Sequence, residues 1–430
     1  LGFVDRQEKE LLVRDFIILN IKEVMIKYGF QYLETPSFEY SDSIGKFLPD
    51  KDRPDEGVFS FKDENKWLSL RYDLTAPLAR YVAKNFLEIP KPFKRYQLGT
   101  VWRNEKPGPG RFREFLQFDA DFVGTKSLQA DAELCVMISE ILEKCGLTKS
   151  DYIIKISSRK ITENLFKKIN VKDNDQKFTA LRALDKIDRL GWDGVKKLLG
   201  EGRKDKSGDY TKGANLKTKD IETIEETLKK KSPETEDLVE ILKIFKDYNF
   251  NNFEFDPSII RGLEYYTGAI FEVNLKFDVT NDKGKVIQFG SIGGGGRYDN
   301  LVNNFGSFDA PATGISIGLD RLVYALMQKK EFKLKQSKPV VICVFDKNLM
   351  KEYINVQTIL RKAGISAEIY PGESKLKKQM EYANKIKSPA VILYGDDEIK
   401  SGKLTLRNLS SGKEQSIKIN ELTYEIKKII

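Results

Sequence analysis

Hydrophobic residues near the start of the chain recur at helical spacing and then begin to alternate with polar ones. Between Gln7 and Tyr28 the apolar positions fall on one side of a helix, and Gly29 stands where such a helix would end. Residues 30–40 read as a strand, but Pro36 cannot donate to a β-ladder and marks a bend or an edge. The pattern predicts a long helix and an interrupted strand, as an ordinary helix–strand unit would also show.

A second alternation, over residues 96–124, predicts a β-hairpin with a polar face. An apolar strand ends at Trp102, a loop of Pro and Gly residues follows, and the return strand carries functional side chains at alternate positions. The polar and aromatic set comprises Arg103, Glu105, Arg111, Arg113, Phe115, Gln117, Asp119 and Asp121. Guanidinium groups match phosphate oxygens, and a ring can stack on a base. The hairpin therefore indicates a triphosphate site, with a solvated charged face as the plain alternative.

The middle of the chain alternates between regular elements and a less regular segment. We expect a strand over residues 67–71, a helix from about Thr75, a helix over 128–144 and a strand over 152–157. Asp73 and Thr75 stand at the first strand-to-helix junction, where helix capping is the plain interpretation. Residues 170–250 are rich in Lys, Asp, Glu and Gly and interrupt the pattern, which indicates an inserted module ending in a helical hairpin over 218–248.

The second half of the chain carries three further polar or glycine-rich stretches. Arg261 and the adjacent Tyr265 and Tyr266 precede a predicted strand. Four consecutive glycines between Ile292 and Arg297 permit close approach of a ligand or another strand. They do not form G-x-G-x-x-G, so a dinucleotide fold is a poor interpretation.

A strand followed directly by a helix ends this half of the chain. The helix begins near Asp320 and places Arg321 in its first turn. A cation there opposes the helix dipole unless a negative ligand compensates it. Arg321 is thus a candidate ligand for an anion, and a plain surface arginine is the alternative.

After residue 337 short apolar strands alternate with helices. The strands are expected at 339–345, 366–370 and 389–395, with helices over 347–362 and 375–387 and a closing strand after them. This order predicts a small α/β domain with a mostly parallel core sheet.

Length and charge extend this picture. A chain of 430 residues is too long for one compact core, so two or three domains are expected. The net charge is +9, and the residues from Lys338 onward hold 17 Lys plus Arg against 11 Asp plus Glu, an excess of +6. This asymmetry favours a nucleic-acid partner, although a Lys-rich composition would also produce it.

The numbers of cysteines and histidines exclude several kinds of catalytic and metal site. Three cysteines form no disulfide framework or metal cluster and read as core residues in a reducing compartment. No apolar run reaches the length of a membrane span, so a cytoplasmic protein without a membrane partner is expected. The chain has no histidine, which excludes a histidine general base, Ser-His triads and His-ligated metals. Arg, carboxylates, Tyr, Gln or the substrate's own groups must carry out any reaction.

Together these motifs resemble those of the class II aminoacyl-tRNA synthetases. The hairpin is similar to motif 2, the first helix and strand to motif 1, and residues 318–322 to motif 3. Residues 261–266 and 295–299 resemble the two signature peptides of the histidyl-tRNA synthetases, and the resemblance extends over the whole chain. Asp121 and Asn104 depart from the Glu and His of some bacterial members, which bears on the subgroup and not on the activity.

The resemblance implies a fold and a domain order. We expect an α+β catalytic domain built on an antiparallel sheet, with a helical insertion and a C-terminal α/β anticodon-binding domain. The implied ranges are 1–169 and 251–330 for the two parts of the catalytic domain, 170–250 for the insertion, and 338–430 for the anticodon-binding domain.

The resemblance also implies a role for each matching residue. Arg103, Arg261 and Gln117 would be catalytic. The histidine ligands would be Asp73, Leu74, Thr75, Arg103, Gln117, Asp121, Arg261, Tyr265, Tyr266 and Tyr298. The ATP ligands would be Arg103, Glu105, Arg111, Arg113, Phe115 and Arg321.

The implied activity is histidine–tRNA ligation with ATP as substrate. Mg²⁺ would enter with the ATP, with no protein metal ligands assigned and no zinc. The partners would be histidine, the tRNA for histidine and a second copy of the chain in a homodimer. The alternative is a catalytically silent, histidine-binding regulatory paralogue of histidine biosynthesis. It is disfavoured because Arg103, Glu105, Arg113 and Arg321 are all present and a domain-sized segment follows Lys338.

Overall fold

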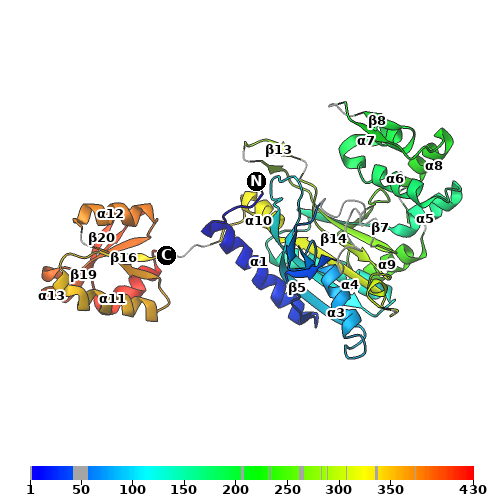
Figure 1. Ribbon diagram of the computed structural model, residues 1–430. Coiled ribbons are helices and arrows are strands. Elements are labelled where there is room, and N and C mark those ends of the chain that lie inside the picture. Colours follow the sequence, from blue (N-terminus) through cyan, green and yellow to red (C-terminus); the bar gives the residue numbers. More distant parts are fainter. Residues whose placement is uncertain are drawn as a thin grey trace. The chain divides into compact units, whose positions relative to one another are not determined.

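The computed structural model describes residues 2–41, 57–204, 208–230, 232–233, 235–260, 266–281, 283–287, 289–306, 308–334, 338–372 and 374–430. The chain forms two compact units, Leu1–Phe332 and Lys333–Ile430 (Figure 1). Among the described residues, no helix is both long and apolar enough to cross a membrane. Cys135, Cys145 and Cys343 are buried and unpaired, as expected for core residues.

An eight-stranded sheet forms the centre of the first unit, in the order β1-β5-β6-β15-β14-β11-β7-β10. The inner strands all pair antiparallel, and only the short edge strands β1 and β10 pair parallel. The strands are β1 Gln31–Tyr32, β5 Phe93–Trp102, β6 Glu114–Val123, β15 Ala312–Gly318, β14 Ser291–Arg297, β11 Ala269–Leu275, β7 Tyr152–Ser158 and β10 Phe253–Phe255. The antiparallel sheet confirms the predicted fold class.

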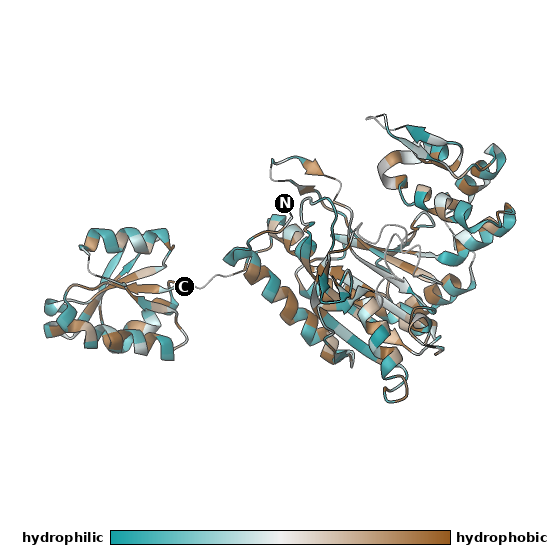
Figure 2. Cartoon of the chain, in the orientation of Figure 1, coloured by the Kyte–Doolittle hydropathy of each residue, from teal (hydrophilic) through white to brown (hydrophobic). Residues whose placement is uncertain are grey.

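Three helices pack on one another and on the central strands. They are α1 (Glu8–Lys27), α4 (Leu128–Lys144) and α10 (Leu319–Gln328). Hydrophobic and hydrophilic residues alternate around α1 (Figure 2), and its buried side includes Ile17, Ile21 and Val24. The predicted long first helix is therefore confirmed, with its apolar stripe against the core.

Smaller sheets and a short helix border the central sheet. The strands β2 (Phe38–Tyr40), β4 (Lys66–Leu70) and β3 (Ser60–Asp63) form one antiparallel sheet, and α3 (Thr75–Lys84) follows β4. Pro36 lies between the edge strand β1 and β2, so the predicted interruption is confirmed. A two-stranded sheet joins β12 (Val279–Thr280) to β13 (Val286–Ile287), and Val302–Asn304 form a 3-10 turn.

The segment predicted as an insertion is mainly helical. It contains α6 (Asn174–Leu184), α7 (Ile187–Leu199), α8 (Thr218–Leu228) and the hairpin of β8 (Gly202–Lys204) and β9 (Tyr210–Lys212), and it follows α5 (Arg159–Lys168). Its last helix, α9 (Glu236–Asp247), buries Leu238, Ile241 and Phe245 and packs against α4 and β7. The two helices predicted over 218–248 are present as α8 and α9, and the apolar side of α9 contacts α4 and β7 of the catalytic unit.

The second unit has its own five-stranded sheet and core. The order is β17-β16-β18-β19-β20, parallel across the first three strands and antiparallel across the last three. The strands are β16 Val340–Ile342, β17 Ala367–Ile369, β18 Ala390–Leu393, β19 Lys403–Asn408 and β20 Glu414–Lys418. The helices are α11 Met350–Lys362, α12 Leu376–Lys385, α13 Asp396–Ser401 and α14 Leu422–Lys427, with 3-10 turns at Lys347–Leu349 and Ile419–Glu421. The predicted small α/β domain is confirmed.

Candidate active site

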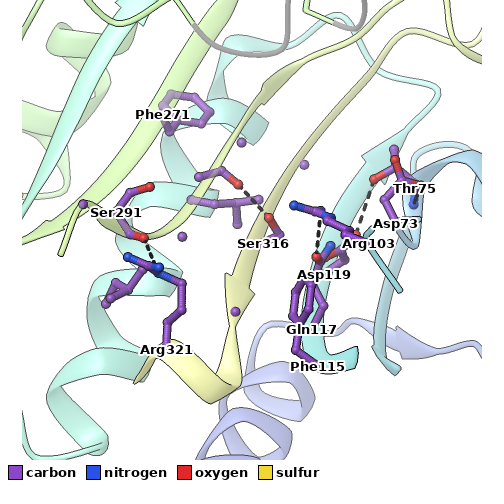
Figure 3. A pocket seen from close by; sticks show the side chains of 18 of the residues that line it. Asp73, Thr75, Arg103, Phe115, Gln117, Asp119, Phe271, Ser291, Ser316 and Arg321 are labelled. Carbon is purple, nitrogen blue, oxygen red and sulfur yellow. Dashed lines mark hydrogen bonds between the residues drawn. The ribbon is translucent and has the colours of Figure 1, made fainter. Parts of the chain in front are cut away.

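A cavity of about 510 Å³ opens over the middle strands of the first unit (Figure 3). Strands β6, β14 and β15, the junction before α3 and the start of α10 all contribute residues to it. The predicted site residues that line it are Asp73, Thr75, Arg103, Glu105, Arg111, Phe115, Gln117, Asp121, Tyr266, Tyr298 and Arg321. Segments more than two hundred residues apart in the sequence thus meet in one cavity.

The alternation of the hairpin determines which side chains face this cavity. On β6 the residues Phe115, Gln117, Asp119 and Asp121 share one face because successive side chains on a strand point to opposite sides. Opposite Asp121 in the register stands Arg95, and opposite Gln117 stands Gly99. The strand pairing therefore places the buried cation Arg95 opposite the buried carboxylate Asp121, beneath the cavity.

Arg103 lies at the end of β5, where several groups hold its guanidinium. Its Nε donates to the Tyr72 carbonyl at 3.2 Å, and its Nη2 donates to Gln117 Oε1 at 3.3 Å. The guanidinium carbon is 4.5 Å from the Tyr72 ring centroid and 5.2 Å from that of Phe115. These contacts present a fixed cation to the cavity.

The hairpin loop contributes an ion pair between Glu105 and Arg111. Glu105 accepts from the Tyr72 hydroxyl at 3.2 Å and forms an ion pair with Arg111 at 3.0 Å. Arg113, predicted as a phosphate ligand, does not line the cavity: its Nε donates to the Glu105 carbonyl at 3.2 Å, and its stem packs against Gly2. The structure thus places Arg113 as a support of the loop.

Arg321 lies at the opposite side of the cavity from Asp73 and Thr75 (Figure 3). Its Nε donates to the Ser291 carbonyl at 2.9 Å, its Nη2 donates to the Phe289 carbonyl, and the guanidinium lies 4.2 Å from the Phe289 ring centroid. The expected conflict with the helix dipole is therefore already offset by carbonyl groups before any anion binds.

The neighbouring Asp320 joins the two ends of the catalytic unit. Its carboxylate accepts from the Leu116 backbone N–H at 2.7 Å and from Arg6 Nε at 2.8 Å. An acid in the first turn of α10 also suits the helix dipole. Asp320 thus fixes the return strand of the hairpin to the helix that carries Arg321.

Asp73 and Thr75 show the capping contacts expected at a strand-to-helix junction and also lie at the cavity. Asp73 Oδ1 accepts from the backbone N–H of Thr75 at 3.1 Å and of Ala76 at 3.0 Å, which is a capping role. Both residues nevertheless line the cavity. Leu74, predicted as a histidine ligand, does not: its side chain is buried, and its carbonyl accepts from Arg95 Nη2 at 2.8 Å.

The end of the cavity near α3 is acidic and deeply buried. Asp121 accepts from the Tyr298 hydroxyl, and its Oδ2 lies 3.2 Å from Arg95 Nε. Burial raises the pKa of both Asp119 and Asp121, while Arg95 lowers them in part, and the pKa of Asp119 reaches about 7. A Cβ on Gly314 would overlap Asp121 Oδ1, so a glycine at this position makes room for the acid.

The four glycines form β14 and line the cavity in part. Within the sheet, a Cβ on Gly295 would overlap the Gly314 carbonyl, and one on Gly293 would overlap the Ser316 carbonyl. Gly293 and Gly295 also line the cavity, as Gly294 does. The predicted close approach is therefore an approach between neighbouring strands, and the absence of side chains leaves the cavity floor open.

A buried ion pair lies beside the backbone of two of the tyrosines that line the cavity, Tyr266 and Tyr298. Arg297 precedes Tyr298 and forms a buried ion pair with Asp131 of α4, and it also donates to the carbonyls of Thr125 and Ser127 at 3.0 Å each. Its own carbonyl accepts from the backbone N–H of Thr267, which follows Tyr266, at 2.7 Å.

Two predicted residues, Arg261 and Tyr265, lie outside the described residues. Other lining residues had no predicted role: Tyr72, Phe112, Asp119, Phe271, Phe289, Ser291 and Ser316. The alternation of β6 was a signal for Asp119. Phe289 and Ser291 had no such signal, because tertiary packing against α10 brings them to the cavity.

Comparison with known proteins agrees with this arrangement. The family model for histidyl-tRNA synthetase matches residues 2–322, and that for an anticodon-binding domain matches residues 339–429. The chain belongs to the histidyl-tRNA synthetase family. The "Histidine--tRNA ligase" of Bartonella quintana is 47% identical over 98% of this chain and 90% of its own length. That of Rhizobium meliloti is 45% identical over 98% and 89%.

Solved structures share the histidyl-tRNA synthetase architecture. The histidyl-tRNA synthetase from Nostoc sp. PCC 7120 has a TM-score of 0.77 and 26% identity, with 100% of this chain and 98% of that chain covered. A protein from Bacillus halodurans described as "ATP phosphoribosyltransferase regulatory subunit/histidyl-tRNA synthetase" has a TM-score of 0.68 and 21% identity, covering 89% and 95%. At that identity the second likeness concerns the fold alone.

Proposed function

We infer that this chain is a histidine–tRNA ligase that activates histidine with ATP and transfers it to the 3′ end of the tRNA for histidine. The observation that carries this function is its likeness, at 44% to 47% identity over 98% of the chain, to proteins with that name. The class II fold, with both its catalytic and anticodon-binding domains, is consistent with it.

We assign the acidic end of the cavity to histidine. Asp121 and Tyr298 are joined by a hydrogen bond and, with Tyr266, would meet the imidazole. Asp73 and Thr75 would bind the amino group, and the family pattern adds Leu74, Arg261 and Tyr265. Leu74 would act only through its backbone, since its side chain is buried.

The other end of the cavity suits ATP. Phe115 offers a ring to the base, Glu105 an acceptor to the adenine amino group, and Arg111 and Arg321 offer cations to the outer phosphates. Arg113 would act indirectly, through the Glu105 backbone that it contacts. Mg²⁺ would enter on the β- and γ-phosphates, and we propose no zinc and no metal held by the protein alone.

The chemistry requires placement and charge more than proton transfer. The carboxylate of histidine is already ionised; it attacks the α-phosphorus, a new O–P bond forms, and the bond to the bridging oxygen breaks to release pyrophosphate. Arg103, with Gln117 beside it and Arg261 from the first signature peptide, would neutralise charge on the α-phosphate as it develops. This role suits a chain without histidine.

We further propose how the parts share the work. Residues 1–169 and 251–330 would form the catalytic domain, 170–250 the insertion, and 338–430 the anticodon-binding domain. A homodimer in the cytoplasm, with no membrane partner, is the proposed working form. Since α9 packs on the central sheet, the part of the insertion available to other contacts is α6 to α8.

A silent regulatory paralogue is the less favoured function. Such a protein would have no need of an ATP end, yet Arg103, Glu105, Arg111 and Arg321 all line the cavity. The family match to an anticodon-binding domain over residues 339–429 also favours an enzyme that handles tRNA.

Amino-acid-dependent ATP–pyrophosphate exchange tests this function directly. With each of the twenty amino acids offered separately, exchange should occur with histidine alone. Arg103→Ala and Arg261→Ala should each lower the exchange rate by about a hundredfold or more, as expected when a group that stabilises transition-state charge is lost. Exchange with another amino acid, or none with histidine, would overturn the assignment.

A further inference from the structure

Asp119 lies in the floor of the cavity, yet neither substrate end uses it in the roles given above. Its side chain is only 3% exposed, and it lies on the same face of β6 as Gln117 and Asp121. Its Oδ1 accepts from Gln117 Nε2 at 2.8 Å, and its Oδ2 accepts from Thr75 Oγ1 at 3.4 Å (Figure 3).

These contacts give the Gln117 side chain a direction. In its ionised form, which predominates above about pH 7, the Asp119 carboxylate only accepts hydrogen bonds, so it selects the –NH₂ end of the amide. The amide oxygen then faces Arg103 and accepts from its Nη2 at 3.3 Å. A reversed amide would place two acceptors together at Asp119 and two donors together at Arg103.

The direction of Gln117 matters because, within the described part of the chain, the Arg103 guanidinium has one further hydrogen bond. Its Nε donates to the Tyr72 carbonyl at 3.2 Å, and the rings of Tyr72 and Phe115 lie beside the guanidinium. Ring contacts tolerate sliding, whereas a hydrogen bond at Nη2 fixes the rotation of the group. A cation that neutralises a transition state must be oriented before the reaction begins.

We propose that Asp119 is a positioning residue, which holds the Gln117 amide in one orientation and thereby aims Arg103 at the reacting carboxylate and α-phosphate. The proposal rests on the histidine activation proposed above. It differs from a direct contact between Asp119 and the amino group of histidine, which would act on substrate binding.

The neutral variant Asp119→Asn separates these roles while keeping the size of the side chain. An asparagine can face Gln117 with either end, so the amide loses its fixed direction. We expect kcat for histidine-dependent exchange to fall about tenfold, as for the loss of one charge-assisted hydrogen bond, with the KM values for ATP and histidine nearly unchanged.

A double-mutant cycle with Gln117→Ala identifies the route of the effect. If Asp119 acts through Gln117, the double variant should be no slower than Gln117→Ala alone. Asp309→Ala, which removes an exposed carboxylate paired with Lys126 on the same unit, should leave kcat unchanged. Thermal unfolding of each variant checks that the fold is intact.

Three results would overturn the proposal: a full additional tenfold loss in the double variant, a raised KM for histidine at normal kcat, or an Asp119→Asn variant as fast as the wild type. Absence of histidine-dependent exchange in the wild type itself is a separate result. It would refute the proposed function before any variant is compared.

Discussion

The buried Asp119 carboxylate lowers the stability of the folded protein when it is ionised. Burial, and then repulsion from Asp121, raises the pKa of Asp119 to about 7, although Arg95 and Gln117 lower it. An unfolded aspartate titrates near pH 4, so between roughly pH 4 and 7 the folded protein keeps a proton that the unfolded chain has lost. The free energy of unfolding therefore falls as pH rises through this range. Above it, the loss reaches its full value and no longer changes with pH.

The Asp119→Asn variant should remove this cost. We expect its melting temperature to exceed that of the wild type at pH 8, with the difference largely absent near pH 3, where the carboxyl is protonated in both the folded and the unfolded state. Thermal unfolding at the two pH values measures it. If the melting temperatures of the variant and the wild type differ by the same amount at both pH values, the ionisation of Asp119 is not the cause. Lower activity with higher stability would be a trade-off typical of active sites.

At the residue scale, the sequence predicted which face of β6 carries chemistry but not how each side chain is used. Alternation gave Gln117, Asp119 and Asp121 a common face, and motif spacing supplied roles for two of them. The role proposed for Asp119 depends on its burial and on its contacts with Gln117 and Thr75, which only the folded structure reveals. Arg113 shows the converse, since its spacing suggested a phosphate ligand, whereas its side chain contacts the Glu105 carbonyl and does not line the cavity.

At the scale of the elements, a buried cluster of Asp131, Arg297 and Thr313 connects α4 to β14 and β15. Asp131 of α4 pairs with Arg297 of β14 and accepts from Thr313 Oγ1 of β15 at 2.9 Å. Asp131→Asn would leave the buried Arg297 guanidinium with the partly exposed Asp299, 3.3 Å away, as its remaining counter-charge, so the free energy of unfolding should fall by about 3 kcal/mol, the lower end for a broken buried pair. Urea unfolding measures this loss.

The matched control replaces both charges at once. Asp131→Asn with Arg297→Met should be more stable than Asp131→Asn alone, because no deeply buried charge then lacks its partner and the carboxylate of Asp299, which also loses its contact with Arg297, is partly exposed to solvent. The KM for histidine should still rise in the double variant if the pair also holds Tyr266 and Tyr298. A double variant less stable than the single one would mean that packing, and not charge, is the main function of the pair.

Elements with strong periodicity were predictable, and their partners were not. Residues 128–144 were predicted as a helix and form α4 over the same range. The helix α9 was also predicted, but its partner was not, because an apolar stripe shows that a helix is covered without showing by what. The four glycines likewise indicated a close approach, and only the sheet order revealed that β11 and β15 make it.

At the scale of the whole molecule, the uneven charge distribution should separate the two steps of the reaction. Of the net +9, the residues from Lys338 onward hold +6, in the unit matched as an anticodon-binding domain. Binding of a polyanion by Lys and Arg releases counterions, so it weakens as salt rises, whereas groups enclosed in a cavity are screened less.

We expect kcat/KM for tRNA to fall about tenfold or more between roughly 50 and 200 mM salt, if several phosphates are contacted. Histidine-dependent ATP–pyrophosphate exchange in the same buffers should change far less and serves as the internal control. Equal salt sensitivity of both steps would mean that the excess charge of the second unit reflects a Lys-rich composition and does not contribute to tRNA binding.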